Sequence, residues 1–519
     1  MKLIHFGMQL KYRNLFKQIA LGILGLIGAS IIILLTSRYG AGMTPDSAAY
    51  ISAARNLADG HGFLTYNGLH LVVQPPLYPI MLAAIKKIIL IDPQISAGYV
   101  NAVLFGLIIY LSGLLLLRYL NSFALIFLGT VSILISNALV QASFMVLSEL
   151  LFIFLILLFL YYLEKYQTKQ DFVSLFLFST SAALACLTRY TGIIMILTGI
   201  ICILLWTKNN NKEKFWHSLI FMLITLSPIT IWIIRNYFIS GTLVGLRAAS
   251  SYTLFENFSF FYNTVLPWYL PLNSTGIYFI FIFIIVSTWI LFGIAPVKIS
   301  NREAIKLIGP CLLFILFYTG IIVVSSTTTA YDKISDRLLS PIYIPAIFIL
   351  FFIFDKILSW LIKFFHIKLV AVLFMVGIVL LLRYPFTNTI HIIEAYKELS
   401  GWGFNSDSWR KNETIEYLNQ HKLLGKSYTL YSNEPEAVYL LTNLKTKCSP
   451  AKKFYNSPQL FNVPPNQRED WLNGENVCLI WFDNSSRTYL FTIDELRKNM
   501  LMTEVAHLKD GAIYTFTVK

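Results

Sequence analysis

The stretch Gly42–Phe63, GMTPDSAAYISAARNLADGHGF, decides how the rest of the chain is interpreted. It follows the first long apolar segment directly, and it carries two aspartates, an arginine, a histidine and a tyrosine. The chain as a whole has the opposite character, because 56% of its 519 residues are hydrophobic and only 13% are charged. Soluble domains carry about a quarter charged residues. We therefore interpret the chain as an integral membrane protein with a polar loop beside its first span.

Apolar segments long enough to cross a bilayer, which takes about 20 residues, recur along the first three quarters of the chain. They are residues 18–37, 97–117, 121–141, 145–163, 172–188, 191–207, 217–236, 275–295, 307–326, 340–359 and 367–384. This pattern predicts a polytopic α-helical membrane protein with about eleven spans. The first apolar segment is long enough to span and lacks a convincing cleavage site, so we expect it to be a retained anchor.

The basic residues orient these spans. Lysine and arginine gather in alternate short loops, near residues 118, 165–169, 208–214, 298–306 and 356–368. Because such loops stay on the cytoplasmic side, we expect a cytoplasmic N-terminus. The polar loop, about 38–95, and everything after Pro385 then lie outside. The same distribution accounts for the net charge of +14 without a nucleic-acid partner.

Two domains follow from this map: a transmembrane domain over 1–384 and a soluble extracytoplasmic domain over 385–519. The tail alternates expected strands with expected helices, which is typical of a small α/β domain. The strands are 427–432, 477–482 and 512–518, and the helices are 434–442 and 492–499. Cys448 and Cys478 can pair there if the compartment is oxidising.

Within the first outer loop, prolines open two short helical patterns, 46–57 and 72–87, which we interpret as interfacial helices. Asp46 stands at the start of the first. One interpretation is an N-terminal cap, which contributes about 1 kcal/mol. The other is a carboxylate that orients and deprotonates a hydroxyl nucleophile just outside the bilayer.

Several pieces, in this order along the chain, resemble the GT-C superfamily of glycosyltransferases. More narrowly, they resemble the branch of protein O-mannosyltransferases and the aminoarabinose transferase of lipid A. The pieces are DSAAYISAARNLADGHGF (46–63), QPPLYP (74–79), SELLF (148–152), LTRYTG (187–192), WIIRNYFISG (232–241) and DRLLSPIY (336–343). They cover most of residues 40–345, whereas the tail matches only in general pattern.

The resemblance implies a sugar donor carried on a polyprenyl phosphate, transfer outside the membrane, and Asp46 as the catalytic acid residue. Gln74 departs from the pattern, since relatives often place Lys, His or Trp before the Pro-Pro pair. A phosphate contact from that position would come from a weaker amide.

A polyprenyl phosphate leaving group needs cations, and arginine suits phosphate because its fork is bidentate. Arg189, Arg235 and Arg337 fall at the outer ends of spans, with Lys333 close by, and we take these four as candidate phosphate ligands. The alternative for the arginines is anchoring at the lipid headgroups.

Glu149 lies near the outer end of its span, where an unpaired carboxylate is costly. It assists Asp46 in catalysis, binds the sugar, or forms a salt bridge to a loop arginine. The candidate substrate-binding residues are Tyr50, Arg55, Gln74 and Tyr78, with an aromatic belt at the interface as the alternative for the tyrosines.

Asp59 and His61 beside Asp46 are weak signs of a divalent metal, so we expect no metal and no other cofactor. We predict a glycosyltransferase of hexosyl or pentosyl type that uses an inverting single displacement. Its partners would be a polyprenyl-phosphate sugar, an acceptor that is a lipid, glycan or protein, and the bilayer, expected to be a bacterial cell membrane. The alternative is a transporter or flippase of a polyprenyl-linked glycan.

Overall fold

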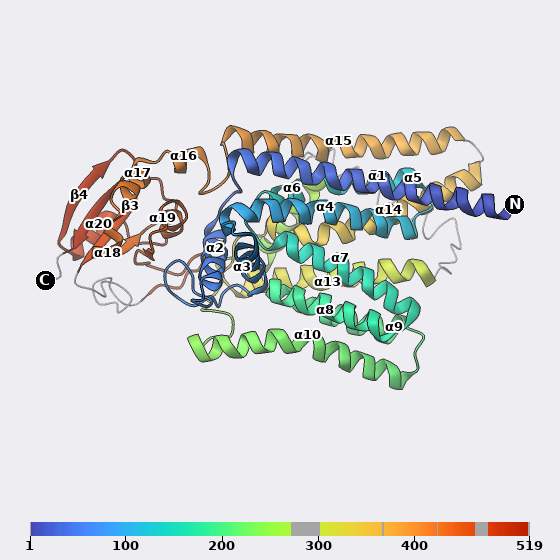
Figure 1. The fold of residues 1–519 in the computed structure, drawn as a ribbon, viewed down its shortest axis with the longest axis horizontal. Helices are drawn as coiled ribbons and strands as arrows, with labels where there is room; N and C mark the ends of the chain where they lie inside the picture. The colour runs from blue at the N-terminus through green and yellow to red at the C-terminus, as the bar shows by residue number, and fades with distance from the viewer. Residues whose placement is uncertain (1, 271–301, 366–367, 423, 462–475, 517–519) are drawn as a thin grey trace.

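The computed structural model describes residues 2–270, 302–365, 368–422, 424–461 and 476–516. Long helices form an elongated bundle, and a small mixed unit sits at one end of it (Figure 1). The bundle helices are α1 (Lys2–Tyr39), α4 (Pro93–Tyr119), α5 (Phe123–Leu134), α6 (Asn137–Ser143), α7 (Glu149–Lys169), α8 (Phe172–Thr188), α9 (Ile194–Trp206), α10 (Asn211–Ser240), α13 (Arg302–Thr328), α14 (Asp336–Phe365) and α15 (Lys368–Glu398).

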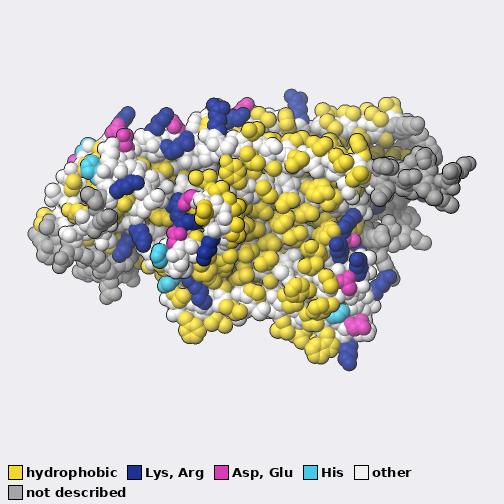
Figure 2. All heavy atoms as spheres, in the orientation of Figure 1, with side chains coloured by type: hydrophobic (Ala, Val, Ile, Leu, Met, Phe, Trp, Pro, Cys, Tyr) yellow, Lys and Arg dark blue, Asp and Glu magenta, His cyan; other side chains and the backbone are white. Residues whose placement is uncertain are grey.

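Apolar side chains cover the middle of the bundle, and lysines and arginines lie toward its two ends (Figure 2). Exposed residues such as Leu34, Ile231 and Leu316 are ones that a soluble protein would bury. Within the described residues, six helices are long and apolar enough to cross a membrane, or seven if the bent pair α5 and α6 counts as one span. The chain is therefore an integral membrane protein, and the count of about eleven spans stays a prediction.

Two of the predicted spans differ from the structure, and a third lies outside the described residues. The span expected over 121–141 is divided into α5 and α6, which meet at 50°. Ser136 marks the break because its hydroxyl caps α6. The helix that contains the span expected over 367–384 continues as α15 through Pro385 to Glu398. Residues 275–295 fall within the undescribed stretch.

The loop after the first span, which we predicted to lie outside, folds into α2 (Pro45–Ala58) and α3 (Leu77–Ile89), and both helices lie between the bundle and the C-terminal unit (Figure 1). The expectation of an interfacial α2 is wrong, because all residues from Ser47 to Ala54 are buried within the protein. Helix α3 begins at Leu77, directly after Pro75 and Pro76, where the prolines were expected to open it. Helix α11 (Leu254–Val265) and the short turns η1 (Tyr190–Ile193) and η2 (Leu266–Trp268) complete this end.

The C-terminal unit, residues 399–516, contains a five-stranded mixed sheet in the order β2-β1-β3-β5-β4. Its strands are β1 (Thr429–Ser432), β2 (Lys447–Cys448), β3 (Val477–Phe482), β4 (Met502–Leu508) and β5 (Gly511–Phe516). Its helices are α16 (Asp407–Arg410), α17 (Glu413–Gln420), α18 (Leu424–Ser427), α19 (Pro435–Thr442) and α20 (Ile493–Asn499). The expected α/β character is confirmed, and β2 and β4 are additions to the predicted strands.

The cysteine pair suggested by the sequence does not form. Cys448 on β2 and Cys478 on β3 are both free thiols. Strand β1 pairs with β2 on one side and with β3 on the other. Two strand spacings of about 4.8 Å exceed the Cα separation of at most about 7 Å that a disulfide can bridge.

Candidate active site

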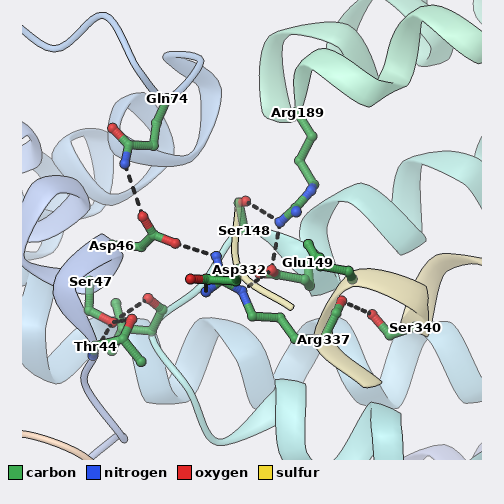
Figure 3. A network of polar contacts seen from close by, with 12 residues as sticks. Thr44, Asp46, Ser47, Gln74, Ser148, Glu149, Arg189, Asp332, Arg337 and Ser340 are labelled. Atoms are coloured by element: carbon green, nitrogen blue, oxygen red, sulfur yellow. Dashed lines mark hydrogen bonds and ion pairs between the residues drawn. The ribbon is translucent and has the colours of Figure 1, made fainter. Parts of the chain in front are cut away.

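Four charged side chains meet at the end of the bundle that faces the C-terminal unit (Figure 3). Each sits at a helix end: Asp46 in the first turn of α2, Glu149 at the start of α7, Arg189 just after α8, and Arg337 in the first turn of α14. Polar residues at these positions leave the apolar spans unbroken while projecting into one space. Helix ends thus gather charges that the sequence separates by up to 291 positions.

The carboxylate of Asp46 does not cap α2. That task falls to Thr44 and Ser47, since the Thr44 backbone N–H donates to Ser47 Oγ at 2.9 Å. The two oxygens of Asp46 instead accept from Gln74 Nε2, at 3.0 Å, and from an Arg337 terminal nitrogen. Asp46 is therefore oriented by two side chains while 29% of it stays exposed to the site.

Arg337 contacts a different carboxylate through each of its three nitrogens (Figure 3). Nε donates to Glu149 Oε1 at 2.9 Å, one terminal nitrogen contacts Asp46, and the other lies 3.5 Å from Asp332 Oδ2. A planar fork fixes the relative positions of the groups that it binds. Arg337 thereby sets the position of Asp46 with respect to the interior of the bundle.

Glu149 is the buried anchor of this network, with only 1% of its side chain exposed. Its Oε1 lies 2.6 Å from Arg189 and also accepts from Arg337, so the predicted alternative of a salt bridge describes its geometry. Ser148, the preceding residue, contacts both Arg189 and the Tyr50 hydroxyl. Burial, followed by the nearby charge of Asp46, raises the pKa of Tyr50 well above its usual value, which keeps the phenol neutral.

A cavity of about 300 Å³ opens beside these residues. Asp46, Tyr50, Gln74, Arg189 and Arg337 line it, so the structure brings these five predicted residues together. Its wall also includes three residues that we did not predict: Arg247, Asp332 and Tyr455. Arg247 lies in the loop after α10 and forms no ion pair with any described residue, and its guanidinium lies 5.2 Å from the Tyr331 ring centre.

Five predicted residues do not line this cavity. One is Glu149, which is buried and contacts two of the lining residues, Arg189 and Arg337. The other four have different partners. Arg235 donates to the Leu71 carbonyl at 2.7 Å and lies over the Trp232 ring. Arg55 forms two hydrogen bonds of 2.8 Å with Asp92 and one with Asn443 of the C-terminal unit. The other two are Lys333, which lies over Phe260 and lines a separate pocket, and Tyr78, which is fully buried against Tyr50.

No group of three or more histidine, cysteine, aspartate or glutamate side chains within the described ranges is arranged to hold a metal ion. Asp59, considered beside His61 as a metal ligand, forms a salt bridge of 2.7 Å with Lys86 instead. Metal dependence therefore gains no support from the arrangement of these side chains, and the absence of a cofactor stays a prediction.

Comparison with known proteins shows which proteins this chain resembles in sequence and in structure. Residues 73–232, about a third of the chain, match the family model described as dolichyl-phosphate-mannose-protein mannosyltransferase. No curated protein sequence gives a match. The chain is similar in structure to ArnT from Cupriavidus metallidurans in the apo state, with a TM-score of 0.58 at 14% identity, and 95% of this chain and 97% of that chain are covered.

Two further solved structures are similar. ArnT from the same organism bound to undecaprenyl phosphate gives a TM-score of 0.59 at 13% identity, with the same coverage of both chains. The oligosaccharyltransferase AglB from Archaeoglobus fulgidus, in complex with an inhibitory peptide and a dolichol-phosphate, gives 0.51 at 12% identity, covering 88% of this chain and 69% of that one. The chain thus has the fold of the GT-C superfamily of membrane glycosyltransferases. Because a fold hosts more than one function, the activity must be argued from the site.

Proposed function

We propose that the protein is a membrane glycosyltransferase that moves a sugar from a polyprenyl-phosphate donor to an acceptor on the outer face of the membrane. The observation that carries the proposal is the meeting of Asp46, Arg337 and Arg189 at one cavity, with the buried Glu149 holding both arginines. The GT-C fold and the match to a mannosyltransferase family model support it.

The reaction follows from the groups in the cavity. The acceptor hydroxyl or amine attacks the anomeric carbon, and the bond from that carbon to the phosphate oxygen breaks. The bonding electron pair leaves with the lipid phosphate, and the acceptor proton passes to Asp46 as general base. One displacement on the face opposite the phosphate inverts the anomeric configuration.

The cations hold the negative charge of the leaving group. Arg247 and the free N–H groups of Arg337 line the cavity, where a phosphate oxygen can accept from them. Arg189 lies beside them but is already bound to Glu149, so we assign it to holding the buried carboxylate. Arg247 thus takes the phosphate-binding role that we had expected of Arg235.

A transporter of a lipid-linked glycan gains less support. Its binding site would be expected near the middle of the membrane, whereas the site here lies at helix ends on one side of the bundle (Figure 1). If the lysine-rich loops are cytoplasmic, this side is the outer one.

The test is transfer from polyprenyl-phosphate sugars by membranes that contain the protein, with a panel of donors and the variant Asp46→Asn. We expect transfer from at least one donor by the wild type and a loss of at least about a hundredfold in the variant, as for a general base. Asp59→Asn is the control, because Asp59 is an aspartate of the same loop paired outside the cavity. Undiminished transfer by Asp46→Asn would refute the base role, and no transfer by the wild type would favour transport.

A further inference from the structure

Asp332 occupies a distinct position among the three carboxylates on Arg337. Its contact is the longest, at 3.5 Å, and its side chain is the most exposed, at 51% against 29% for Asp46 and 1% for Glu149. An exposed ion pair contributes at most about 1 kcal/mol, whereas breaking a buried one costs several. Of the three carboxylates, Asp332 is therefore the one that an incoming anion displaces most easily.

The charges of the site favour such a displacement. Asp46, Glu149 and Asp332 carry three negative charges, and the two guanidinium groups that pair with them, Arg337 and Arg189, carry two positive ones. Arg247 in the cavity wall adds a third positive charge. A phosphate that enters the cavity adds further negative charge next to these carboxylates. Like charges in contact with one another repel substantially in a partly buried site.

A second contact keeps Asp332 in place on its other side. The hydroxyl of Tyr455 donates to Asp332 Oδ1 at 2.9 Å, and Tyr455 belongs to a turn of the C-terminal unit. The neighbouring Asn456 fixes this turn on the membrane domain, since its side chain donates to the Tyr331 carbonyl and its own carbonyl accepts from the Ser251 N–H. Asp332 can thus leave Arg337 and keep a hydrogen-bond partner.

We propose that Asp332 is an exchangeable internal anion: it occupies the Arg337 nitrogen that the phosphate group of the donor takes over, and it then stays with Tyr455. This inference rests on the proposed function, because it assigns the phosphate of that donor to a particular nitrogen. Asp332 is a positioning residue and does not itself react. Its position makes the C-terminal unit part of the donor site.

The inference predicts that removing the charge of Asp332 raises the affinity for the donor phosphate. If the carboxylate only supported the structure, its removal would lower that affinity. In Asp332→Asn the amide keeps the shape and can still accept from Tyr455, but it no longer competes for Arg337. We expect the purified protein in detergent to bind radiolabelled undecaprenyl phosphate about fivefold more tightly at low salt, in the range of one half-exposed ion pair. The gain should shrink at high salt, which screens exposed charges.

The matched control is Asp59→Asn, because Asp59 is 52% exposed and also paired with a cation, Lys86, but lies outside the cavity. Its affinity should equal that of the wild type, and thermal unfolding should confirm that both variants are folded. Inorganic phosphate should show the same gain for Asp332→Asn, since the phosphate group is the competitor.

Unchanged or weaker binding by Asp332→Asn, beside a wild type that binds, would overturn the exchange and leave the proposed donor intact. A gain confined to the lipid would overturn it too, because the effect would then lie in the binding of the prenyl chain. No binding by the wild type would instead overturn the donor class, and the exchange with it.

Discussion

Replacing Arg337 with lysine separates the charge of this side chain from its shape. The positive charge stays, but one ammonium group must serve carboxylates that three nitrogens of the guanidinium now contact. Lysine is a compact point charge, whereas arginine binds several acceptors in a fixed plane. If the fork is what positions Asp46, activity should fall even though the charge of the site is unchanged.

The size of the loss follows from the contacts. A hydrogen bond to a charged group contributes about 1.5–3 kcal/mol, and a half-exposed ion pair such as that with Asp332 up to about 1 kcal/mol. Lysine can keep one of the two strong contacts, to Asp46 or to Glu149, and therefore loses about 1.5–4 kcal/mol in all. Since 1.36 kcal/mol is a factor of ten in rate, kcat/KM should fall about 10- to 900-fold.

The assay is the initial rate of sugar transfer against donor concentration, with the donor that the wild type uses. Arg55→Lys is the matched control, because Arg55 also binds a carboxylate through two nitrogens but does so outside the cavity. We expect that control to keep its rate within about threefold, as for a change away from the reacting groups. A lysine variant of position 337 that keeps a third or more of the wild-type kcat/KM would refute the positioning argument.

Three further outcomes are expected. Gly25→Val should lower the free energy of unfolding by about 1–3 kcal/mol through overpacking, because a Cβ at Gly25 would lie 2.7 Å from the Gly106 carbonyl oxygen. Thermal unfolding in detergent measures this change. An unchanged unfolding midpoint would contradict the close contact between the two helices. Tyr66→Phe removes the hydroxyl that donates to Glu436, so residues 399–516 should be cleaved faster in limited proteolysis. An unchanged cleavage rate would show that this hydrogen bond does not stabilise the C-terminal unit. Arg487→Met leaves the buried pair Glu434 and Glu436 without its cation and should cost about 3–5 kcal/mol at pH 7.5. Burial already raises the pKa of Glu434 above its unfolded value, so protonation favours the folded state and the deficit of this variant should shrink as the pH falls toward 5; a constant deficit would mean that both carboxylates reach water.

The helices were predictable because an apolar run near the length of a bilayer rarely forms anything but a membrane span. The residues at which the helices end were less predictable. Pro385 marked a boundary in the sequence, yet α15 passes through it, because membrane helices tolerate a proline where other groups satisfy the freed backbone carbonyl. The short strand β2 has only two residues, which is too few for a pattern to register.

Within the site, Asp46 was predicted because its loop resembles that of the GT-C superfamily, and Glu149, Arg189 and Arg337 because they are charged residues at the expected outer ends of apolar spans. The same criterion failed for Arg235, because position along a helix does not give the direction in which a side chain points. Its guanidinium turns to the Leu71 carbonyl instead. Arg247 and Tyr455 lie in irregular segments, where no periodicity indicates which residues converge.

The buried charges of the site are better explained by activity than by stability. A buried ion network gains little over apolar side chains of similar volume. Glu149 nevertheless sits almost fully buried between two arginines at the start of an apolar helix. Its effect is to hold Arg337 at Nε while a terminal nitrogen contacts Asp46, so that the plane of the guanidinium is fixed. An arrangement that contributes little to folding but fixes a carboxylate and a guanidinium group beside each other is what the proposed transfer from a lipid phosphate requires.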